Sequence, residues 1–279
     1  MEINAYYNGK FCGRDEITLP LTDRAVFFGD GIYDAAIGRN GKIFMENEHV
    51  DRFFCNAKAL DIPLTVSYAE LISILRTVAA GINGKPFFIY FQLTRFSSER
   101  SHAYPDLNRS NLLVTANPID LKEPHQTLRL IEAEDIRHTI CHIKTLNLIP
   151  SVLAAKKAQT IGADETVFHR GETVTECAHS NVHIIKHGKI ITHPADNMIL
   201  PGISRAHMIK TAAALSIPLE ERPFSLSELR FADEVLVTSS SKLCLRAKSF
   251  MDVRYDTDSF KTGAKICVKM REDFDKATE

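Results

Sequence analysis

The sequence predicts two α+β domains, and three of its features lead to this fold class. The chain has 279 residues, 44% of them hydrophobic and 25% charged, which suffices for two modest domains at roughly 100–200 residues each. Hairpin signals outnumber strand–helix–strand units, which disfavours a doubly wound parallel sheet. A polar segment with a proline at each end, Pro118 and Pro124, separates the two halves. We therefore expect a first domain over 1–117, a linker over 118–124 and a second domain over 125–279.

In the first half, turn signals, helical periodicity and strand patterns alternate. Asn-Gly pairs between apolar runs are strong hairpin signals, and apolar residues spaced by three and four predict helices. Ser67 and Glu70 form a capping box at the start of one such helix. The predicted elements are hairpin turns at Asn8-Gly9 and Asn40-Gly41, helices over 49–61 and from 67 onward, and buried strands over 87–94 and 111–116.

The second half continues with the same kinds of signal. A glycine after a helical pattern ends the helix, and glycine or proline pairs between strand patterns mark hairpins. The predicted elements are strands near 127–133 and 139–146, a helix over 151–161 ended by Gly162, hairpins at Arg170-Gly171 and His187-Gly188, and helices from Ser204, near Ser225 and over 262–276.

Charge and cysteine content exclude several classes of protein. Lys and Arg number 34 against 35 Asp and Glu, a formal net charge of −1, so no nucleic-acid surface is predicted. No stretch approaches the roughly 18 consecutive apolar residues of a membrane span, and no secretory signal opens the chain. The six cysteines include no CxxC pair, which favours reduced thiols in the cytoplasm. His138 and His142 lack the context of a metal centre, so no metal site is predicted.

Lys144 is the first candidate for chemistry. It lies among apolar neighbours in the strand-like segment 141–146. A lysine in such a setting either extends its amine to solvent or is desolvated, and desolvation makes the amine a nucleophile. The residue types alone leave both interpretations open.

A phosphate site is the second candidate. Gly202-Ile203-Ser204 opens a helix and offers free backbone N–H groups at the positive end of its dipole. Ser240 can add a hydroxyl and Arg52 a guanidinium. Ser204 could equally be an ordinary helix cap, and Arg52 could lie on the wet side of its helix. With Lys144 and the carboxylate of Glu176, these groups are what pyridoxal phosphate requires.

Several short motifs follow one another along the chain and carry a family resemblance. They are Phe28-Gly29-Asp30-Gly31-Ile32-Tyr33, Glu48-His49-Val50-Asp51-Arg52, Thr94-Arg95, Arg100-Ser101-His102, Asp135-Ile136-Arg137, Ile143-Lys144-Thr145-Leu146-Asn147-Leu148, Thr173-Val174-Thr175-Glu176 with Ser180-Asn181, and Met198-Ile199-Leu200-Pro201-Gly202-Ile203-Ser204-Arg205. With them, the chain from Tyr6 to about Ser241 resembles the fold-type IV pyridoxal-phosphate enzymes, and most of all the D-amino acid aminotransferases.

The resemblance implies a role for individual residues. Lys144 would form the Schiff base with the cofactor and then move the proton at the substrate α-carbon. Glu176 would keep the pyridine nitrogen protonated. The phosphate would be bound by Arg52, the N–H groups of Ile203 and Ser204, and Ser240, and Arg137 would lie near the Lys144 amine and the ring hydroxyl. The substrate carboxylate would be held by Tyr33, Arg100 and His102, and Tyr90 is predicted to lie in the same substrate site.

The resemblance also implies an architecture. A small α/β sandwich domain would be followed by a larger α/β pseudobarrel domain, with the cofactor between them. In the family, the loop of the Arg-x-His pair reaches over from the other subunit. A homodimer is therefore implied.

The activity implied is transamination of D-amino acids such as D-alanine and D-glutamate, with a 2-oxo acid such as 2-oxoglutarate as acceptor. The Arg-x-His pair at 100–102 is the discriminating feature, because aminodeoxychorismate lyases generally lack it. L-branched-chain aminotransferases typically place a tyrosine five residues after the lysine, where this chain has Ile149. These two same-fold enzymes stay as alternatives, as does a non-catalytic cofactor-binding protein.

Two segments depart from the family pattern. Cys177-Ala178-His179 stands where a small serine-rich run is usual, and Lys242-Leu243-Cys244-Leu245 replaces a loop that contains Glu and Pro. We expect both segments to border the side-chain pocket.

Overall fold

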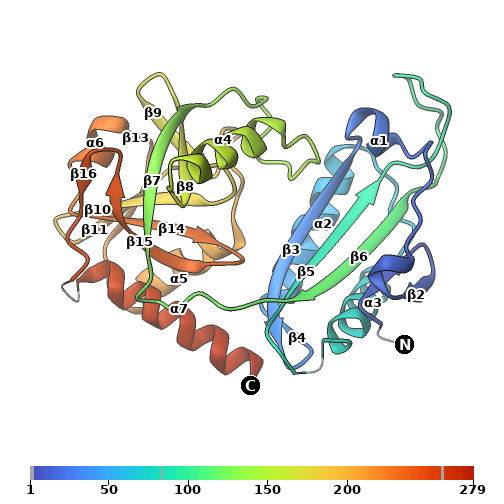
Figure 1. Ribbon diagram of the computed structural model, residues 1–279, viewed down its shortest axis with the longest axis horizontal. Helices are drawn as coiled ribbons and strands as arrows, with labels where there is room; N and C mark the ends of the chain where they lie inside the picture. The colour runs from blue at the N-terminus through green and yellow to red at the C-terminus, as the bar shows by residue number, and fades with distance from the viewer. Residues whose placement is uncertain (1–2, 83, 259–260) are drawn as a thin grey trace. The chain divides into compact units, whose positions relative to one another are not determined.

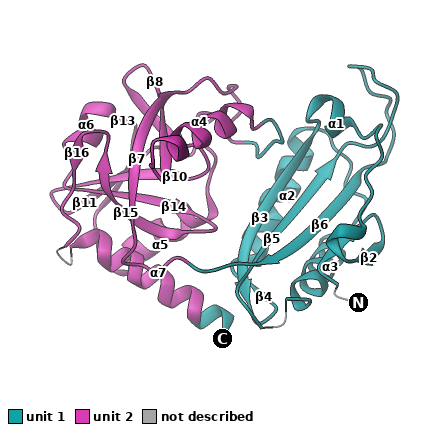
Figure 2. Ribbon diagram, viewed as in Figure 1, with its two compact units in different colours: residues 1–121, 143–147, 276–279 teal, residues 122–142, 148–275 magenta. Residues whose placement is uncertain are grey.

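The computed structural model describes residues 3–82, 84–258 and 261–279, and the chain divides into two compact units (Figure 2). Unit 1 is formed by Met1–Leu121, Ile143–Asn147 and Lys276–Glu279, and unit 2 by Lys122–His142 and Leu148–Asp275. The two short segments that join unit 1 belong in sequence to the range expected for the second domain. Ile143 explains one of them, because its side chain is buried in the hydrophobic core of unit 1.

Unit 1 is a six-stranded sheet in the order β2-β1-β6-β5-β3-β4, with helices α2 and α3 on one face (Figure 1). All its strand pairs are antiparallel. Its elements are β1 Ala5–Tyr7, β2 Lys10–Cys12, the 3₁₀ turn Arg14–Glu16, α1 Arg24–Phe28, β3 Gly31–Arg39, β4 Lys42–Ile43, α2 Glu46–Ala59, α3 Tyr68–Ala80, β5 Phe87–Thr94 and β6 Asn111–Pro118.

The two faces of this sheet differ because side chains alternate along each strand. In β5, Ile89 and Phe91 alternate with Tyr90, and the first two belong to the core beneath the helices. Phe53 of α2 packs on Phe91 there, with ring centroids 4.8 Å apart. Tyr90 and Gln92 lie on the opposite face of the sheet.

Unit 2 is built on a ten-stranded sheet in the order β12-β11-β10-β14-β15-β7-β8-β9-β13, with β16 beside β15. Parallel pairs join β7 to both β15 and β8. Its elements are β7 Thr127–Glu134, α4 Ile149–Thr160, β8 Glu165–Arg170, β9 Thr173–Cys177, β10 Asn181–Lys186, β11 Lys189–Thr192, α5 Ile203–Ala214, β12 Leu219–Glu221, β13 Phe224–Ser225, α6 Leu226–Arg230, β14 Glu234–Ser239, β15 Leu243–Phe250, β16 Val253–Arg254 and α7 Thr262–Thr278.

Both faces of this curved sheet are buried. On one face, Val182, Val235 and Leu245 from three neighbouring strands share a core with Leu229 of α6. On the other, α5 and α7 cover the sheet (Figure 1) and pack their apolar residues against β10, β14 and β15. Strands buried on both faces read as continuous apolar runs, as in the Val235-Leu236-Val237 segment of β14.

Most predicted elements are confirmed, because their signals are local. The two Asn-Gly turns adopt positive φ at both residues, as type I′ hairpins require, with Asn40 at 54° and Gly41 at 75°. Ser67 caps α3 through the predicted capping box with Glu70. Helix α4 begins two residues earlier than predicted, at Ile149, with Pro150 in its first turn.

The strand predicted over 139–146 is wrong. The N–H of Cys141 donates to the Asn197 carbonyl, and the following residues meet β3 only at an isolated bridge between Ile32 and Thr145. Cys141, Ile143 and Thr145 are buried, as the alternation requires. Alternating burial does not need a hydrogen-bonded ladder, so the pattern alone could not distinguish a strand from an extended segment.

His183 of β10 is a fully buried polar group inside the sheet of unit 2. Its ring nitrogens lie 2.8 Å from the Thr192 hydroxyl and 2.9 Å from the Thr238 hydroxyl. Burial, reinforced by the positive charge of Arg205, lowers the pKa of His183 to about 3. The imidazole is therefore neutral in the folded protein at physiological pH.

Stability should fall as the solution becomes acidic because of this histidine. His183 of the unfolded chain is protonated below its ordinary pKa of 6.5. In the folded chain it stays neutral down to about pH 3. The contribution is complete above pH 6.5 and is lost by about 1.4 kcal/mol per pH unit below it. Urea unfolding of His183→Gln should show a correspondingly shallower pH slope, whereas His187→Gln, at a largely exposed position, should keep the wild-type slope. Equal slopes in all three proteins would contradict the assignment.

Among the described residues, no helix combines the length and the apolar character needed to span a membrane.

Candidate active site

Lys144 lies on the free edge of β3. Its carbonyl accepts the N–H of Tyr33 at 3.0 Å, and the N–H of Leu146 donates to the Gly31 carbonyl at 3.1 Å. Gly31 must be glycine for this contact, because a Cβ there would come within 2.8 Å of Leu146 and 2.7 Å of the Leu93 carbonyl. Backbone pairing thus fixes where the lysine side chain begins.

The Lys144 amine lies over an aromatic pair. Its Nζ is 4.2 Å from the ring centroid of Tyr33, and that ring stacks on Tyr90 with centroids 5.5 Å apart. The Tyr90 hydroxyl donates to Gln92 at 2.6 Å, and burial, with Tyr33 nearby, raises the pKa of Tyr90. Lys144 is half-buried, and in the described contacts its amine does not pair with a carboxylate.

Arg52 is held by a buried carboxylate between β3 and α2. Its Nε and Nη2 both lie 2.8 Å from Asp34, whose second neighbour is the His49 ring at 2.7 Å. Burial opposes the charge on Asp34, but Arg52 and His49 outweigh it and hold the pKa of that carboxyl far below its usual range. Asp34 faces the helices while its neighbour Tyr33 faces the other side, as alternation along β3 demands.

Glu176, in β9 of unit 2, is a buried carboxylate with three kinds of donor. Arg137 Nη1 lies 2.5 Å away, Asn181 Nδ2 2.9 Å, and the Leu200 N–H 3.2 Å. Arg137 is also bidentate to Asp135. Although burial opposes its charge, both carboxylates raise the pKa of the Arg137 guanidinium. The ion pair with Glu176 is a contact that the sequence did not suggest.

Asn181 connects Glu176 to the start of α5. Its amide donates to both Glu176 and the Leu200 carbonyl. Its oxygen lies so close to Gly202 that a Cβ at that position would approach within 2.0 Å. Gly202 is the N-cap of α5 and has no capping side chain. The helix therefore presents the N–H groups of Ile203 and Ser204 without an internal acceptor.

The serine turn, residues 239–242, also lies near Asn181. Asn181 pairs with Thr238 near the end of β14, so Ser240 follows two residues after a strand position that neighbours Asn181. The turn is tightened by a bond between the Ser239 and Ser241 hydroxyls, 3.4 Å apart. Unit 2 thus gathers one carboxylate, one helix N-terminus and one hydroxyl-rich turn around Asn181.

The Arg-x-His loop is anchored within unit 1. Arg24 donates to the carbonyls of Ser101 and His102, at 2.7 and 3.3 Å. The Arg100 guanidinium and the His102 ring both lie against Phe28. In the described contacts, neither residue reaches Tyr33. The loop is thus held against its own unit without joining the lysine and the two tyrosines.

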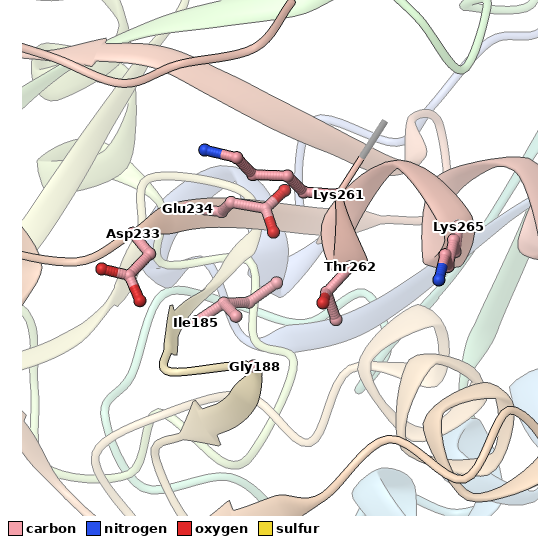
Figure 3. Close-up of a pocket in the computed structure, with 7 residues that line it drawn as sticks. All are labelled: Ile185, Gly188, Asp233, Glu234, Lys261, Thr262 and Lys265. Carbon is pink, nitrogen blue, oxygen red and sulfur yellow. The ribbon is translucent and has the colours of Figure 1, made fainter. Parts of the chain in front are cut away.

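A cavity of about 350 Å³ lies elsewhere in unit 2, at the start of α7 (Figure 3). None of the predicted site residues lines it. Three of its charged lining groups have partners of their own: Asp233 pairs with Lys186, Glu234 accepts the Gly263 N–H, and Lys261 pairs with Asp256.

Sequence reasoning assigned no role to several groups that hold the site together. Asp34, Asp135 and Asn181 position Arg52, Arg137 and Glu176, respectively. All three stand inside or beside the quoted motifs. Their position next to motif residues was the one signal in the sequence that could have indicated a role. Asp34 and Arg52 lie on different elements, as do Asn181 and Glu176, so these two pairings were not readable from the sequence. Asp135 and Arg137 are two residues apart in one quoted motif.

Each of the two units contains groups of the kind that pyridoxal phosphate requires. Unit 1 offers a half-buried primary amine over an aromatic ring, which suits the cofactor aldehyde. Unit 2 offers a buried carboxylate for a pyridinium nitrogen, and beside it an uncapped helix N-terminus with a serine turn, which suits a phosphate. Gly202, pressed against Asn181, keeps that helix end free of a side chain. The residues present fit the group.

Comparison with known proteins agrees with this chemistry. The family model for class IV amino-transferases matches residues 31–250. A D-alanine aminotransferase of Listeria monocytogenes serotype 4b (strain F2365) is 39% identical over 239 residues, which cover 84% of this chain and 83% of that protein. One of Staphylococcus aureus (strain MSSA476) is 39% identical over 240 residues, which cover 85% of both.

Solved structures share the fold. The branched-chain amino acid aminotransferase of Escherichia coli superposes with a TM-score of 0.90 at 21% identity, covering 100% of this chain and 96% of that chain. The 4-amino-4-deoxychorismate lyase of Pseudomonas aeruginosa gives 0.84 at 23% identity, covering 97% and 99%. The family model, the relatives and this fold together show that the chain belongs to the class IV amino-transferase family and is a pyridoxal-phosphate-dependent aminotransferase of fold type IV.

Proposed function

We propose that the protein transaminates D-amino acids of the D-alanine and D-glutamate type, with a 2-oxo acid such as 2-oxoglutarate as acceptor. The observation that carries this is the 39% identity to D-alanine aminotransferases over more than four fifths of the chain. The Arg100–His102 pair supports it, since carboxylate capture by a guanidinium is the feature that distinguishes this subgroup. The two same-fold alternatives, L-branched-chain aminotransfer and aminodeoxychorismate cleavage, are outcomes of the test below.

The groups of unit 1 would act at the reacting carbon. Pyridoxal phosphate, when bound, supplies a conjugated ring that stabilises negative charge at the α-carbon of an amino acid. Lys144 would carry the cofactor and afterwards take and return the α-proton as a free amine. The stacked rings of Tyr33 and Tyr90 would lie beneath the amine at the reacting carbon.

The groups of unit 2, with Arg52 of unit 1, would hold the rest of the cofactor. Glu176, kept in place by Asn181 and the Leu200 N–H, would face the pyridine nitrogen with a negative charge. The N–H groups of Ile203 and Ser204 and the Ser240 hydroxyl would bind the phosphate. Arg52 would add a guanidinium already oriented by Asp34, and Arg137 would contribute a fixed positive charge near the ring hydroxyl.

The substrate carboxylate would be bound by Tyr33 together with Arg100 and His102 of a second copy of the chain. In the described contacts of one chain these two residues pack on Phe28 rather than on Tyr33, which supports a shared site. An apolar surface on α4 supports a homodimer as well, because Ile149, Val152 and Leu153 are each more than half exposed. All six cysteines are free, which supports a cytoplasmic location.

The handedness of the reaction tests the proposal. Fixing the carboxylate on one side decides which α-hydrogen faces Lys144, so the clamp selects the enantiomer. Arg100→Ala should raise KM for D-alanine and lower kcat/KM. The loss of transition-state stabilisation should be about 2–4 kcal/mol, the scale for losing one partner of a charge-assisted pair. The measurement is kcat/KM for D-alanine, L-alanine and L-leucine in both proteins. A wild type that prefers the L-substrates would favour the branched-chain alternative, and release of pyruvate from aminodeoxychorismate would favour the lyase.

A mixing experiment tests the shared site separately. Lys144→Ala and Arg100→Ala should each be poorly active alone. After dissociation and random reassociation, one site of each hybrid dimer would contain both wild-type side chains, restoring roughly a quarter of the wild-type sites. Absence of any recovery in verified hybrids would contradict the contribution of Arg100 from the second subunit.

A further inference from the structure

The two segments that depart from the family pattern meet in unit 2 on one buried carboxylate. Glu165, at the start of β8, is fully buried. Its Oε2 lies 3.1 Å from Nε2 of His179 and 3.4 Å from Nζ of Lys242. The Lys242 amine in turn lies 2.8 Å from the same His179 nitrogen. Residues from separate elements thus form one compact cluster.

The carboxylate at the centre is fully engaged. Besides the two basic side chains, Oε2 accepts the Ser180 hydroxyl at 2.7 Å and Oε1 accepts the Thr166 N–H at 3.1 Å. A buried charge is tolerated only when it is paired and hydrogen-bonded. Burial alone would raise the pKa of the Glu165 carboxyl, but His179, Lys242 and Ser180 together hold it below its usual value.

Lys242 is the last residue of the serine turn. Its backbone N–H donates to both the carbonyl and the hydroxyl of Ser239, at 3.2 and 3.3 Å. The next residue, Leu243, is buried with φ at +54°, a left-handed conformation that leucine rarely adopts. Such a turn persists only where its surroundings hold it. The Lys242 side chain is almost completely buried, at 11% exposure, and its ion pair with Glu165 stabilises the turn.

The other end of the cluster reaches the turn after Glu176. Ser180 hydrogen-bonds Glu165 and directly precedes Asn181, the residue that orients Glu176. The N–H of Cys177 donates to the Ser180 carbonyl at 2.7 Å, and the N–H of Ala178 donates to the Thr166 carbonyl at 2.9 Å. The cluster therefore ties together the two turns that carry Ser240 and Asn181.

We propose that Lys242 and Glu165 are positioning residues for cofactor binding: their buried ion pair fixes the serine turn so that the Ser240 hydroxyl meets the phosphate. His179 covers the pair on its solvent side. The inference rests on the proposed role of Ser240 in phosphate binding. It assigns a function to both departures from the family pattern, since His179 and Lys242 stand in them.

The test compares pyridoxal phosphate with pyridoxal, which lacks the phosphate. Release of pyridoxal phosphate from the holoenzyme after dilution, followed by the visible absorbance, should become roughly ten- to hundredfold faster in Lys242→Met, the scale for losing a hydrogen bond to a charged group. The affinity of the cofactor-depleted protein for pyridoxal should change little. A general loss of structure would weaken both ligands equally, and that result would overturn the proposal.

Conservative and matched variants sharpen the result. Lys242→Arg should restore slow release, because it keeps the charge, and Lys189→Met, which removes an exposed lysine paired with Glu220, should behave as wild type. Since Lys242→Met removes one of the two basic partners of the buried Glu165, the double variant Glu165→Gln/Lys242→Met provides a second measurement. It should fold and still release the cofactor quickly, and slow release from it would overturn the proposal.

Ser240→Ala separates the two levels of the argument. Normal release from Ser240→Ala would overturn the phosphate assignment and with it the role of Lys242. Fast release from Ser240→Ala together with normal release from Lys242→Met would overturn the positioning role alone.

Discussion

Lys144→Ala should abolish steady-state transamination and remove the visible absorbance of the lysine-bound cofactor. In the proposed mechanism the Lys144 amine, which lies over Tyr33, both carries the cofactor and transfers the α-proton, so one substitution removes two functions. Absorbance spectra of the purified variant and initial rates with D-alanine check the expectation.

Two further variants place this result in context. Lys156→Ala removes an exposed lysine of α4 that contacts only Gln159 among the described side chains, and it should leave both readouts unchanged. Lys144→Arg keeps a positive charge over Tyr33 but cannot form the covalent link, so it should be as inactive as Lys144→Ala. Full turnover by either Lys144 variant, in buffer without added amines, would refute the assignment.

Glu176→Gln should lower the rate of amine transfer from D-alanine to the cofactor by roughly a hundredfold or more, the scale for losing one preorganised electrostatic partner. The side chain keeps its shape and can still accept the Leu200 N–H. It loses the negative charge that we propose for the pyridine nitrogen, and with it the ion pair to Arg137. Stopped-flow single turnovers of the holoenzyme measure the effect directly.

Cofactor retention distinguishes electrostatic from structural roles of Glu176. The variant should retain most of its cofactor, because the proposed phosphate donors at α5 and Ser240 are untouched. Glu176→Asp keeps the charge on a shorter stem and should be less impaired than Glu176→Gln. A Gln variant that loses its cofactor yet turns over normally once saturated would show that the carboxylate is only structural.

The elements with local signals could be predicted from the sequence. The Asn40-Gly41 turn, the Ser67 cap and the Gly162 helix end depend on the conformations of one or two residues. Neighbouring residues alone impose those conformations, so tertiary structure had nothing to override. The family motifs likewise lie in short contiguous segments, which is why the family could be predicted and a lysine, a carboxylate and phosphate donors could be proposed from the sequence.

The partners of those residues could not be predicted. Nothing in the segment around Lys144 indicates that it leaves the strand order of unit 2 and lies along β3. The ten-stranded order places β15 beside β7, more than a hundred residues apart in sequence. Bringing such distant segments together costs conformational entropy, and burial of both faces of the sheet compensates for it. That burial is a property of the whole sheet and cannot be read from one segment.

By itself, the sequence determined the family, the residue types at the site and most helices and hairpins. Only the tertiary structure decided that Asp34 orients Arg52, that Arg137 pairs with Glu176, and that both unusual segments converge on Glu165. The physical reason is that a buried charge must find a partner. Which partner it finds depends on the elements that the fold brings together.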